Sequence, residues 1–480
     1  MKKFSLCRLF GARIYQYLAA VTATLCILSS EMHFGWSSPS LPALTKGTYR
    51  FQITGHEASW LAVALLPGTI LGAVLAGKLT GILGRRKVIL LTSIPLLAGW
   101  IMIGLANNVT VLYVARFVAG ISSGLSFSTV PMYLGEIAEP QIRGMLASLC
   151  PVFVVFGILL INILGNYLPI DTTAFVSCIF PVILFLTFIW MPESPSFLLQ
   201  RNRTEEAKAT LVTLRGEEAA KIELEILTQN LVQQTEDNKS IMWSLFLDKV
   251  NRRAATIGYG LRTIQQFCGA TAITFYCKTI FEEEEDFFSA NLSTILYFSL
   301  QLVIAFIAIF VVDIFGRKPL LLVSSSGCCL TLLVMSAYLY VKESTSIDTS
   351  HLSFVPLLVL FLNVGFFSIG VRNIPLLMMG EVFSPRVKPI ALCFGTIYYS
   401  IMAIVSAKIF YLTKDAFGMY VPFLIFGFLT FLSIFFVVFV VPETKGLRLE
   451  DIQLKLGKKK DVGGVMFKLG MTNDVQVTEL

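Results

Sequence analysis

The segment Thr263–Tyr276, TIQQFCGATAITFY, combines apolar residues with side chains that can form several hydrogen bonds. Gln265 and Gln266 are adjacent amides, and Thr271 and Tyr276 add hydroxyl groups. Amides inside a bilayer cost free energy unless they find partners, so they normally face a bundle interior or a wet cavity. Uncharged donors and acceptors at that depth suit a ligand made of hydroxyl groups. The alternative is that the two glutamines only join neighbouring helices.

Other kinds of chemistry find no support in the sequence. The three histidines, His33, His56 and His351, are scattered, and no nucleophile–base set or phosphate-binding glycine loop is present. The nine cysteines show no metal-ligand spacing and are typical of small buried residues rather than of a disulfide framework. We therefore expect no enzyme activity, no metal and no cofactor.

The elements that must position this segment are membrane helices. The chain has 480 residues, of which 55% are hydrophobic and 14% are charged, and its mean hydropathy is +0.74. A soluble protein of this composition would expose large apolar patches, and several runs exceed the ~20 apolar residues that cross a bilayer. The composition predicts an all-α membrane protein. The net charge of +7 reflects orientation in the membrane and not affinity for nucleic acid.

Hydropathy predicts twelve transmembrane helices in two sets of six. They cover about residues 15–38, 57–80, 88–106, 110–134, 145–167 and 173–191, and then 254–281, 291–312, 319–341, 352–380, 390–412 and 420–441. The expected domains are an N-terminal half (1–191), a cytoplasmic helical linker (192–253), a C-terminal half (254–441) and a cytoplasmic tail (442–480).

The linker sequence predicts two helices. One opens at Glu205 with Leu211 and Leu214 on one face, and the second covers Glu217–Val232. The apolar positions of the second helix are Ile222, Leu224, Ile226, Leu227 and Leu231. Such helices can pack beneath a bundle and join its halves, and the alternative is a solvated linker.

Lysine and arginine are concentrated on one side of this topology. With a cytoplasmic N-terminus, the short cytoplasmic segments collect Lys2, Lys3, Arg8, Arg13, Arg85, Arg86, Lys87, Arg143, Arg317, Lys318, Arg386 and Lys388. The other side keeps Lys46, Arg50, Lys342 and Lys414, together with the acidic run Glu282–Asp286. This asymmetry predicts that both termini are cytoplasmic.

Three motifs of the first half recur in the second half. The pairs are GKLTGILGRRK (Gly77–Lys87) with VDIFGRK (Val312–Lys318), Glu136 and Arg143 with Glu381, Arg386 and Lys388, and PES (Pro192–Ser194) with PETKG (Pro442–Gly446). All three pairs occupy corresponding positions after the spans. They indicate two homologous six-helix halves related by an axis along the membrane normal.

These motifs together resemble the sugar porter family of the major facilitator superfamily, over about residues 15–455. The resemblance is carried by GRRK (Gly84–Lys87), RFVAG (Arg116–Gly120), PMYLGEIAEPQIRG (Pro131–Gly144), PESPSFLL (Pro192–Leu199), QQFCGATAITFY (Gln265–Tyr276), DIFGRK (Asp313–Lys318), GEVF (Gly380–Phe383) and PETKG. The segment Gly35–Pro42 is most similar to the insect facilitated trehalose transporters. The resemblance implies the major facilitator fold, with twelve helices in two six-helix repeats.

The resemblance also implies roles for individual residues. It places sugar-binding groups at Gln265, Gln266, Thr271 and Gln301, and an aromatic outer gate at Phe275 and Tyr276. A cytoplasmic latch is expected to pair across the halves when the outer side is open and to separate when the inner side opens. Its members are Arg85, Glu136, Arg143, Glu193, Asp313, Arg317, Glu381, Lys388 and Glu443. Several such pairs can bias a two-state equilibrium, although one exposed pair contributes only ~0–1 kcal/mol.

The sequence departs from the family pattern around the expected sugar. Pro151 stands where the family has a glutamine, Leu376 replaces the tryptophan that covers the sugar, and Ser400 lies near another tryptophan position. Each lost hydrogen bond costs ~0.5–1.5 kcal/mol. These changes predict a lower affinity for hexoses or a different ligand. Gly81 replaces an aspartate of the first-half latch motif, which predicts a weaker latch there.

Three charged residues are expected inside the spans, namely Glu31, Arg116 and Arg372. A lone guanidinium at that depth costs several kcal/mol, so Arg372 needs Glu31, a water-filled cavity or an anionic group of a substrate as its partner. Proton symporters of the family carry an aspartate where this chain has Ser37. Facilitated diffusion is therefore favoured, while Glu31 and His33 keep proton coupling open.

We therefore expect facilitative transport (uniport) of a sugar, trehalose or a hexose, across the plasma membrane by alternating access. The alternatives are a proton-coupled sugar symporter and a non-transporting sugar sensor on the same fold. The expected partners are a small-molecule sugar and the lipid bilayer, and the protein is expected to function as a monomer. Asn291, which begins the triplet Asn291-Leu292-Ser293, is the candidate for glycosylation.

Overall fold

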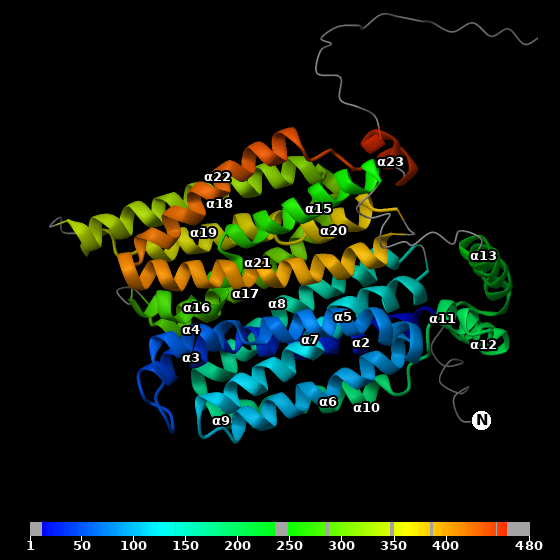
Figure 1. Cartoon of the computed structure of the whole chain (residues 1–480), viewed down its shortest axis with the longest axis horizontal. Coiled ribbons are helices and arrows are strands. Elements are labelled where there is room, and N and C mark those ends of the chain that lie inside the picture. Colours follow the sequence, from blue (N-terminus) through cyan, green and yellow to red (C-terminus); the bar gives the residue numbers. More distant parts are fainter. Residues whose placement is uncertain are drawn as a thin grey trace, which may run out of the picture.

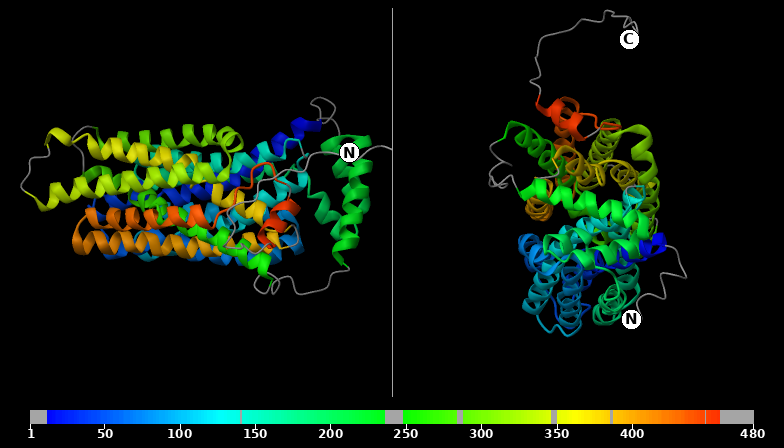
Figure 2. Two further views of the ribbon diagram at one scale, coloured as in Figure 1. Left: turned by 90° about the horizontal axis from the view of Figure 1, so that it is seen from above. Right: turned by 90° about the vertical axis from the view of Figure 1, so that its right-hand side faces the viewer.

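The computed structural model describes residues 12–139, 141–235, 248–283, 288–345, 350–384, 387–447 and 449–457. Within these ranges every regular element is a helix. Figure 1 shows two bundles of nearly parallel helices lying against each other, one from each part of the sequence. The right-hand view of Figure 2 looks along the helices and separates the two bundles clearly.

The first bundle is drawn in blue and cyan in Figure 1. Its helices are α2 (Ala12–Gly35), α3 (Ser37–Thr45), α4 (Gly55–Val63), α5 (Leu65–Leu83), α6 (Arg85–Gly104), α7 (Val109–Ile137), α8 (Arg143–Tyr167), α9 (Ile170–Ser177) and α10 (Ile179–Phe188). The pairs α2 and α3, α4 and α5, and α9 and α10 each form one continuous span, so the nine helices make six membrane-length spans. The first span runs on to Thr45, seven residues beyond the predicted end at residue 38.

The second bundle runs from green to orange in Figure 1. Its helices are α15 (Lys249–Phe267), α16 (Ala270–Glu283), α17 (Ala290–Phe315), α18 (Arg317–Ser344), the short 3-10 helix η1 (Ser350–Leu352), α19 (Val355–Ile369), α20 (Ile374–Val382), α21 (Lys388–Phe417) and α22 (Tyr420–Phe439). A last helix, α23 (Leu449–Gly457), packs against this bundle, where Gln453 Nε2 donates to the Val382 carbonyl at 2.6 Å. The proposed domain boundaries at residues 191, 253 and 441 stay predictions.

The linker forms α11 (Pro195–Gln200), α12 (Thr204–Arg215) and α13 (Glu217–Thr235), which lie beyond one end of the bundles (Figure 2). Leu211 and Leu214 are buried as expected, and Gln16 of α2 donates to the Leu214 carbonyl at 2.7 Å. These contacts fasten α12 to the first bundle.

The apolar face predicted for α13 is only partly covered. Leu224 and Leu227 pack on a small cluster that includes Leu198 and Leu199. Ile222 and Ile226, however, are 65% and 49% exposed. The spacing of apolar residues identified the helix correctly but overestimated how much of it is buried, because the main contacts of α13 in the described chain are with α11 and α12. The side chain of Leu231 lies outside the described residues.

Eleven described helical segments are long and apolar enough to cross a membrane. The one predicted span missing from these eleven is the seventh, 254–281, which is divided between α15 and α16, of 19 and 14 residues. The interruption falls at Cys268 and Gly269, where Gly269 has φ +81°. Glycine adopts this left-handed conformation without the steric cost that a Cβ atom brings. The twelve-helix topology is thus completed by one broken helix.

A second interruption separates α19 from α20 at Gly370–Asn373. Ser324 of α18 stabilises it, because its hydroxyl donates to the Phe366 carbonyl at 2.6 Å and accepts from the Val371 N–H at 3.0 Å. A Cβ atom on Gly370 would lie 2.6 Å from the Leu320 carbonyl oxygen, so the helices approach closely here. Irregular backbone at membrane depth is tolerated only where protein or water satisfies its polar groups.

The apolar cores differ between the two ends of the molecule. At one end, a single cluster joins both bundles and includes Trp36, Trp100, Phe275, Phe298 and Phe423. At the other end, each bundle has its own cluster, one around Tyr133 and Phe188 and one around Met379 and Phe383. We call the second end, which carries Arg85, Arg143 and Arg317, the basic end, and the first the opposite end. The two halves are sealed together at the opposite end.

Candidate functional site

Gln266 lies in the last turn of α15, directly before the break in that helix. Its side chain is fully buried, and its Oε1 accepts from the Thr271 hydroxyl at 2.6 Å. Its backbone carbonyl accepts from the Ser406 hydroxyl of α21 at 3.0 Å. The Gln266 Nε2 atom has no hydrogen-bond partner among the described residues. This residue therefore offers a fixed donor that is free for a ligand.

Gln265 connects the two broken helices. Its Nε2 donates to the Arg372 carbonyl at 2.6 Å, and its Oε1 accepts from Arg262 Nη1 at 2.9 Å. The carbonyl of Arg372 is available because that residue lies in the break between α19 and α20. The predicted pair Gln265 and Gln266 thus sits where irregular backbone and amide side chains meet, as in transporters whose sites form at discontinuous helices.

Gln301 and Tyr276 supply further polar atoms without partners. Gln301 lies in α17, is 2% exposed, and its Oε1 has no hydrogen-bond partner in the described chain. The Tyr276 hydroxyl of α16 is likewise unpaired among these residues. A buried polar group without a partner costs ~1–3 kcal/mol. Groups of this kind are therefore candidates to bind a ligand or water.

Arg372 of the second bundle and Glu31 of the first lie near enough to influence each other electrostatically. Glu31 of α2 is 6% exposed, and its carboxyl interacts electrostatically with the Arg372 guanidinium. The two side chains form no direct ion pair among the salt bridges of the described residues. Tyr297 and Tyr399 also interact with Arg372. Of the three partners expected for Arg372, Glu31 is supported by electrostatics alone, and the partner of Arg372 stays a prediction.

Arg116 is fully buried in the first bundle, where both terminal nitrogens donate to oxygen atoms while Nε has no partner among the described residues. Its Nη1 donates to the His33 carbonyl, and its Nη2 donates to the Ser37 hydroxyl at 2.8 Å and to the Ala62 carbonyl at 3.2 Å. The guanidinium also lies 5.5 Å from the Trp36 ring centroid. The group beside Arg116 is therefore a hydroxyl, at the position where the resemblance places the carboxylate of proton symporters.

The predicted outer-gate residues lie in the cluster that joins the two bundles. Phe275 is fully buried, with its ring centroid 4.6 Å from that of Phe34 in α2. Tyr276 stacks on Phe410 of α21 at 5.2 Å. The contact of Phe275 joins the two bundles, whereas that of Tyr276 lies within the second bundle. The role of both residues as an outer gate stays a prediction.

Polar bridges at the opposite end also join the bundles, and the sequence reasoning missed them. Lys46 Nζ lies 2.6 Å from Glu282 Oε2, and Asn166 Nδ2 donates to the Asn291 carbonyl at 3.4 Å. Lys408 of α21 lies 3.5 Å from the Trp60 ring centroid of α4 and donates to Ser59 at 2.8 Å. The sequence did contain a hint of the Lys46–Glu282 ion pair, because Lys46 and the acidic run beginning at Glu282 were predicted on the same side of the membrane.

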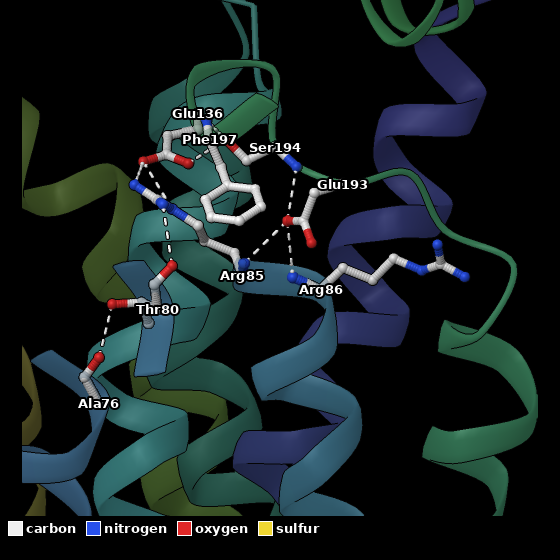
Figure 3. A network of polar contacts seen from close by, with 8 residues as sticks. All are labelled: Ala76, Thr80, Arg85, Arg86, Glu136, Glu193, Ser194 and Phe197. Atoms are coloured by element: carbon white, nitrogen blue, oxygen red, sulfur yellow. Dashed lines mark hydrogen bonds and ion pairs between the residues drawn. The ribbon is translucent and has the colours of Figure 1, made fainter. Parts of the chain in front are cut away.

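The basic end of the first bundle carries a compact ionic network, shown in Figure 3. Glu136 Oε1 accepts from Arg85 Nη2 at 2.9 Å, and the Ser194 hydroxyl donates to the other oxygen of Glu136. Glu193 Oε1 accepts from the backbone N–H groups of Arg85 and Arg86 at 2.9 and 3.0 Å. Glu193 therefore caps the N-terminus of α6, where free N–H groups and the helix dipole favour a negative charge.

The second bundle repeats this network. Glu381 Oε1 accepts from Arg317 Nη2 at 2.9 Å and Glu381 Oε2 accepts from the Thr444 hydroxyl. Glu443 accepts from the backbone N–H groups of Arg317 and Lys318 at 3.0 and 2.9 Å, at the start of α18. Burial would raise the pKa of Glu443, but the N–H groups of Lys445, Arg317, Lys318 and Thr444 outweigh it and lower that pKa. The three paired motifs thus build equivalent structures.

Most of the predicted latch residues therefore pair within their own half. Arg143 donates weakly to the Ala138 carbonyl at 3.5 Å, and Lys388 interacts with Glu381 and is repelled by Arg143 of the other half. Burial lowers the pKa of Lys388, and this repulsion adds to the effect. The side chain of Asp313 and all of Arg386 lie outside the described residues. Pairing across the halves is expected in another conformation and stays a prediction. Asn291 is half-buried, and its glycosylation also stays a prediction.

Three comparisons with known proteins agree with this arrangement. The family model described as "Sugar (and other) transporter" matches residues 5–456. The facilitated trehalose transporter Tret1 of Drosophila willistoni is 33% identical over 445 residues, which cover 92% of this chain and 51% of that protein. The Tret1-2 homolog of Drosophila sechellia is 32% identical over 454 residues, covering 94% of this chain and 93% of the relative. The chain thus spans about half the length of the first relative and nearly all of the second.

Solved structures of a bacterial transporter share the fold. The inward open conformation of the xylose transporter XylE from E. coli superposes with a TM-score of 0.75 at 20% identity, covering 92% of this chain and 99% of that one. The proton:xylose symporter XylE bound to 6-bromo-6-deoxy-D-glucose gives a TM-score of 0.74 at 21% identity, with the same two coverages. At this identity the likeness concerns the fold.

Proposed function

The chain belongs to the sugar transporter family, and from this premise we propose that it carries trehalose or a hexose across the plasma membrane by facilitated diffusion. It is a multi-pass membrane transporter with the major facilitator fold and not an enzyme. The choice of trehalose or a hexose rests on the insect facilitated trehalose transporters that are its relatives.

The observation that carries this proposal is the set of buried, uncharged polar atoms without partners around the break in α15 and α16. The free atoms are Gln266 Nε2, Gln301 Oε1 and the Tyr276 hydroxyl, so donors and acceptors are both represented. A sugar hydroxyl is at once a donor and an acceptor, and each hydrogen bond to it contributes ~0.5–1.5 kcal/mol. Two or three such bonds give only weak binding, which lets a transporter release its solute on the other side of the membrane.

Alternating access is supported by the different packing at the two ends of the molecule, where the bundles share one apolar cluster at the opposite end and have separate clusters at the basic end. With the basic end in the cytoplasm, as the lysine and arginine bias indicates, the sealed end faces outward. This conformation would then be inward-facing, with Phe275 closing the outer path and the Arg85 and Arg317 networks held apart in their own halves. A single chain contains both halves, so one monomer suffices for the cycle.

Facilitated diffusion is favoured over proton symport by the surroundings of Arg116. Its partners are a hydroxyl and two carbonyl oxygens, which do not titrate near neutral pH. A specific observation supports the symporter as the second candidate, because the buried carboxyl of Glu31 interacts with Arg372 beside the amide site. Such a carboxyl could bind and release a proton during the cycle.

A substrate panel in proteoliposomes tests the proposal. Purified protein should equilibrate labelled trehalose or glucose without concentrating it inside, and a protonophore should leave the initial rate unchanged. Accumulation above the outside concentration in an acid-outside gradient, abolished by the protonophore and by Glu31→Gln, would establish the symporter instead. Absence of uptake for trehalose, glucose, fructose and polyols alike would refute sugar transport.

A further inference from the structure

A second arginine lies at the amide site, beside the one that the sequence reasoning identified. Arg262 of α15 is half-buried, and its Nη1 donates to Gln265 Oε1 at 2.9 Å. Its guanidinium carbon lies 5.1 Å from the Tyr399 ring centroid. Its Nε atom is buried and has no hydrogen-bond partner among the described residues. Arg262 therefore retains donor capacity that the protein itself does not use.

Gln265 and Tyr399 bring Arg262 and Arg372 together. Gln265 accepts from the Arg262 side chain and donates to the Arg372 carbonyl, and Tyr399 interacts with both guanidinium groups. The only carboxylate whose interaction with either arginine is observed in the described chain is Glu31. Two positive charges thus face one negative charge, which leaves one positive charge uncompensated when Glu31 is ionised.

Arg116 shows how the protein treats an arginine that binds no ligand. That side chain is 0% exposed, and although its Nε is unpaired like that of Arg262, its two terminal nitrogens make three hydrogen bonds to oxygen atoms of its own bundle. Arg262 makes one observed hydrogen bond and, like Arg372, remains half-buried. An uncompensated charge at membrane depth is costly and usually serves a substrate or an ion. The accessible pair Arg262 and Arg372 is therefore suited to an anion.

We propose that the transporter accepts, and prefers over neutral hexoses, a sugar that carries a single carboxylate, such as a hexuronate. Its carboxylate would bind between Arg262 and Arg372, and its ring hydroxyls would bind Gln266 and Gln301. The inference rests on the proposed sugar transport and specifies its substrate class. A carboxylate matches the planar donor fork of arginine, and its single charge equals the uncompensated charge of the site, whereas a phosphate monoester carries nearly two.

Uptake and inhibition by the full-length protein in proteoliposomes test this proposal. D-glucuronate should inhibit the uptake of labelled glucose at lower concentration than unlabelled glucose does. Labelled glucuronate should itself enter, and an inside-positive potential set with potassium and valinomycin should speed its entry, because a uniported monoanion carries charge. Glucose entry should not respond to the potential.

Matched variants assign the carboxylate site. Arg262→Gln and Arg372→Gln should each lower the ratio of glucuronate to glucose uptake about 10- to 100-fold, the range expected from loss of a charge-assisted hydrogen bond. Arg203→Gln, which alters an exposed linker arginine paired with Glu206, should leave the ratio unchanged. Because the readout is a ratio measured on one preparation, a general loss of folded protein does not imitate the result.

The outcomes separate the two proposals. If glucose or trehalose enters but glucuronate neither enters nor inhibits, the carboxylate inference is wrong and sugar transport stands. If glucose 6-phosphate inhibits more strongly than glucuronate, the single-charge argument is wrong. If neither neutral nor acidic sugars enter, both proposals fail.

Discussion

The two halves of the chain are nearly identical at the basic end and different at the membrane centre. Arg85, Glu136 and Glu193 make the same contacts in the first half as Arg317, Glu381 and Glu443 make in the second. At the centre, the first half seals Arg116 behind its own oxygen atoms. The second half instead presents amides, arginines and two broken helices.

This difference indicates which parts of the repeat serve structure and which serve the substrate. The networks at the basic end satisfy the N-termini of α6 and α18, a requirement that both halves share. The divisions of the first-half spans at Trp36, Ala64 and Cys178 keep right-handed helical backbone angles. In the second half, by contrast, Gly269 has φ +81° and four residues separate α19 from α20, whereas the counterpart α7 is continuous over Val109–Ile137. This difference supports the proposal that polar recognition of the solute is concentrated in the second half.

The largest effects are expected from Arg85→Ala and Arg317→Ala. The two side chains are 8% and 12% exposed, and removal of either leaves a carboxylate that is 18% or 22% exposed without its partner. Breaking a fully buried pair costs ~3–5 kcal/mol, which is the upper limit here, and equivalence of the halves predicts similar losses. Thermal unfolding of purified protein in detergent measures both. A large loss in only one variant would show that the networks are not equivalent.

Substitution of the glycines that precede these arginines should distinguish the halves. Gly84 and Gly316 have φ of +90° and +89°, so alanine at either position costs ~1–3 kcal/mol in backbone strain. The added Cβ would lie 2.4 Å from Glu193 Oε2 in the first half and 3.0 Å from Glu443 Oε2 in the second. Gly84→Ala should therefore lower the unfolding temperature more. Gly77→Ala, where a Cβ meets nothing within 4 Å, is the control and should not lower it.

A smaller effect is expected from the hydroxyl groups that bind the paired glutamates. Ser194→Ala removes a hydrogen bond to Glu136 and the cap that accepts from the Phe197 N–H at 3.3 Å. Thr444→Val removes the hydrogen bond to Glu381. We expect losses of about 2 and about 1.5 kcal/mol from the hydrogen bonds and the cap. Equal unfolding temperatures for the two variants would exclude a stabilising role of the Ser194 cap.

The smallest effect is expected at the bridge between the halves on the opposite end. Lys46 is 61% exposed and pairs with Glu282, so the pair contributes ~0–1 kcal/mol and is screened by salt. Lys46→Ala should change the rate of sugar exchange less than about fivefold. A tenfold or greater change would mean that this bridge, rather than the aromatic contacts of Phe275, holds the outer side closed.

Much of the architecture could be predicted because it depends on regular patterns. Twelve apolar runs, one-sided positive charge and three recurring motifs follow directly from the bilayer and from repetition of the half. The same patterns did not reveal that Glu193 and Glu443 cap helices. Each glutamate is far in sequence from the helix that it caps, and the sequence suggested only ion pairs with arginines.

The site was predicted in part. Gln265 and Gln266 stood out as adjacent amides in an apolar run, and the structure places them at a helix break. Arg262 was missed, although it lies eight residues inside the predicted span that begins at residue 254. Its proposed role rests on its contact with Gln265 and its position beside Tyr399. Those contacts depend on packing between helices, which one sequence does not show.

The most direct test of the account is equilibrium exchange of a labelled sugar by purified protein with equal concentrations on both sides of the membrane. The variant carrying Gln265→Ala and Gln266→Ala should exchange the sugar about 10- to 100-fold more slowly than the unaltered protein, from the loss of two hydrogen-bonding amides. The control Gln52→Ala, at an exposed glutamine that donates to the Thr45 carbonyl, should exchange normally. Unchanged exchange by a correctly folded double variant would contradict a solute site at these amides.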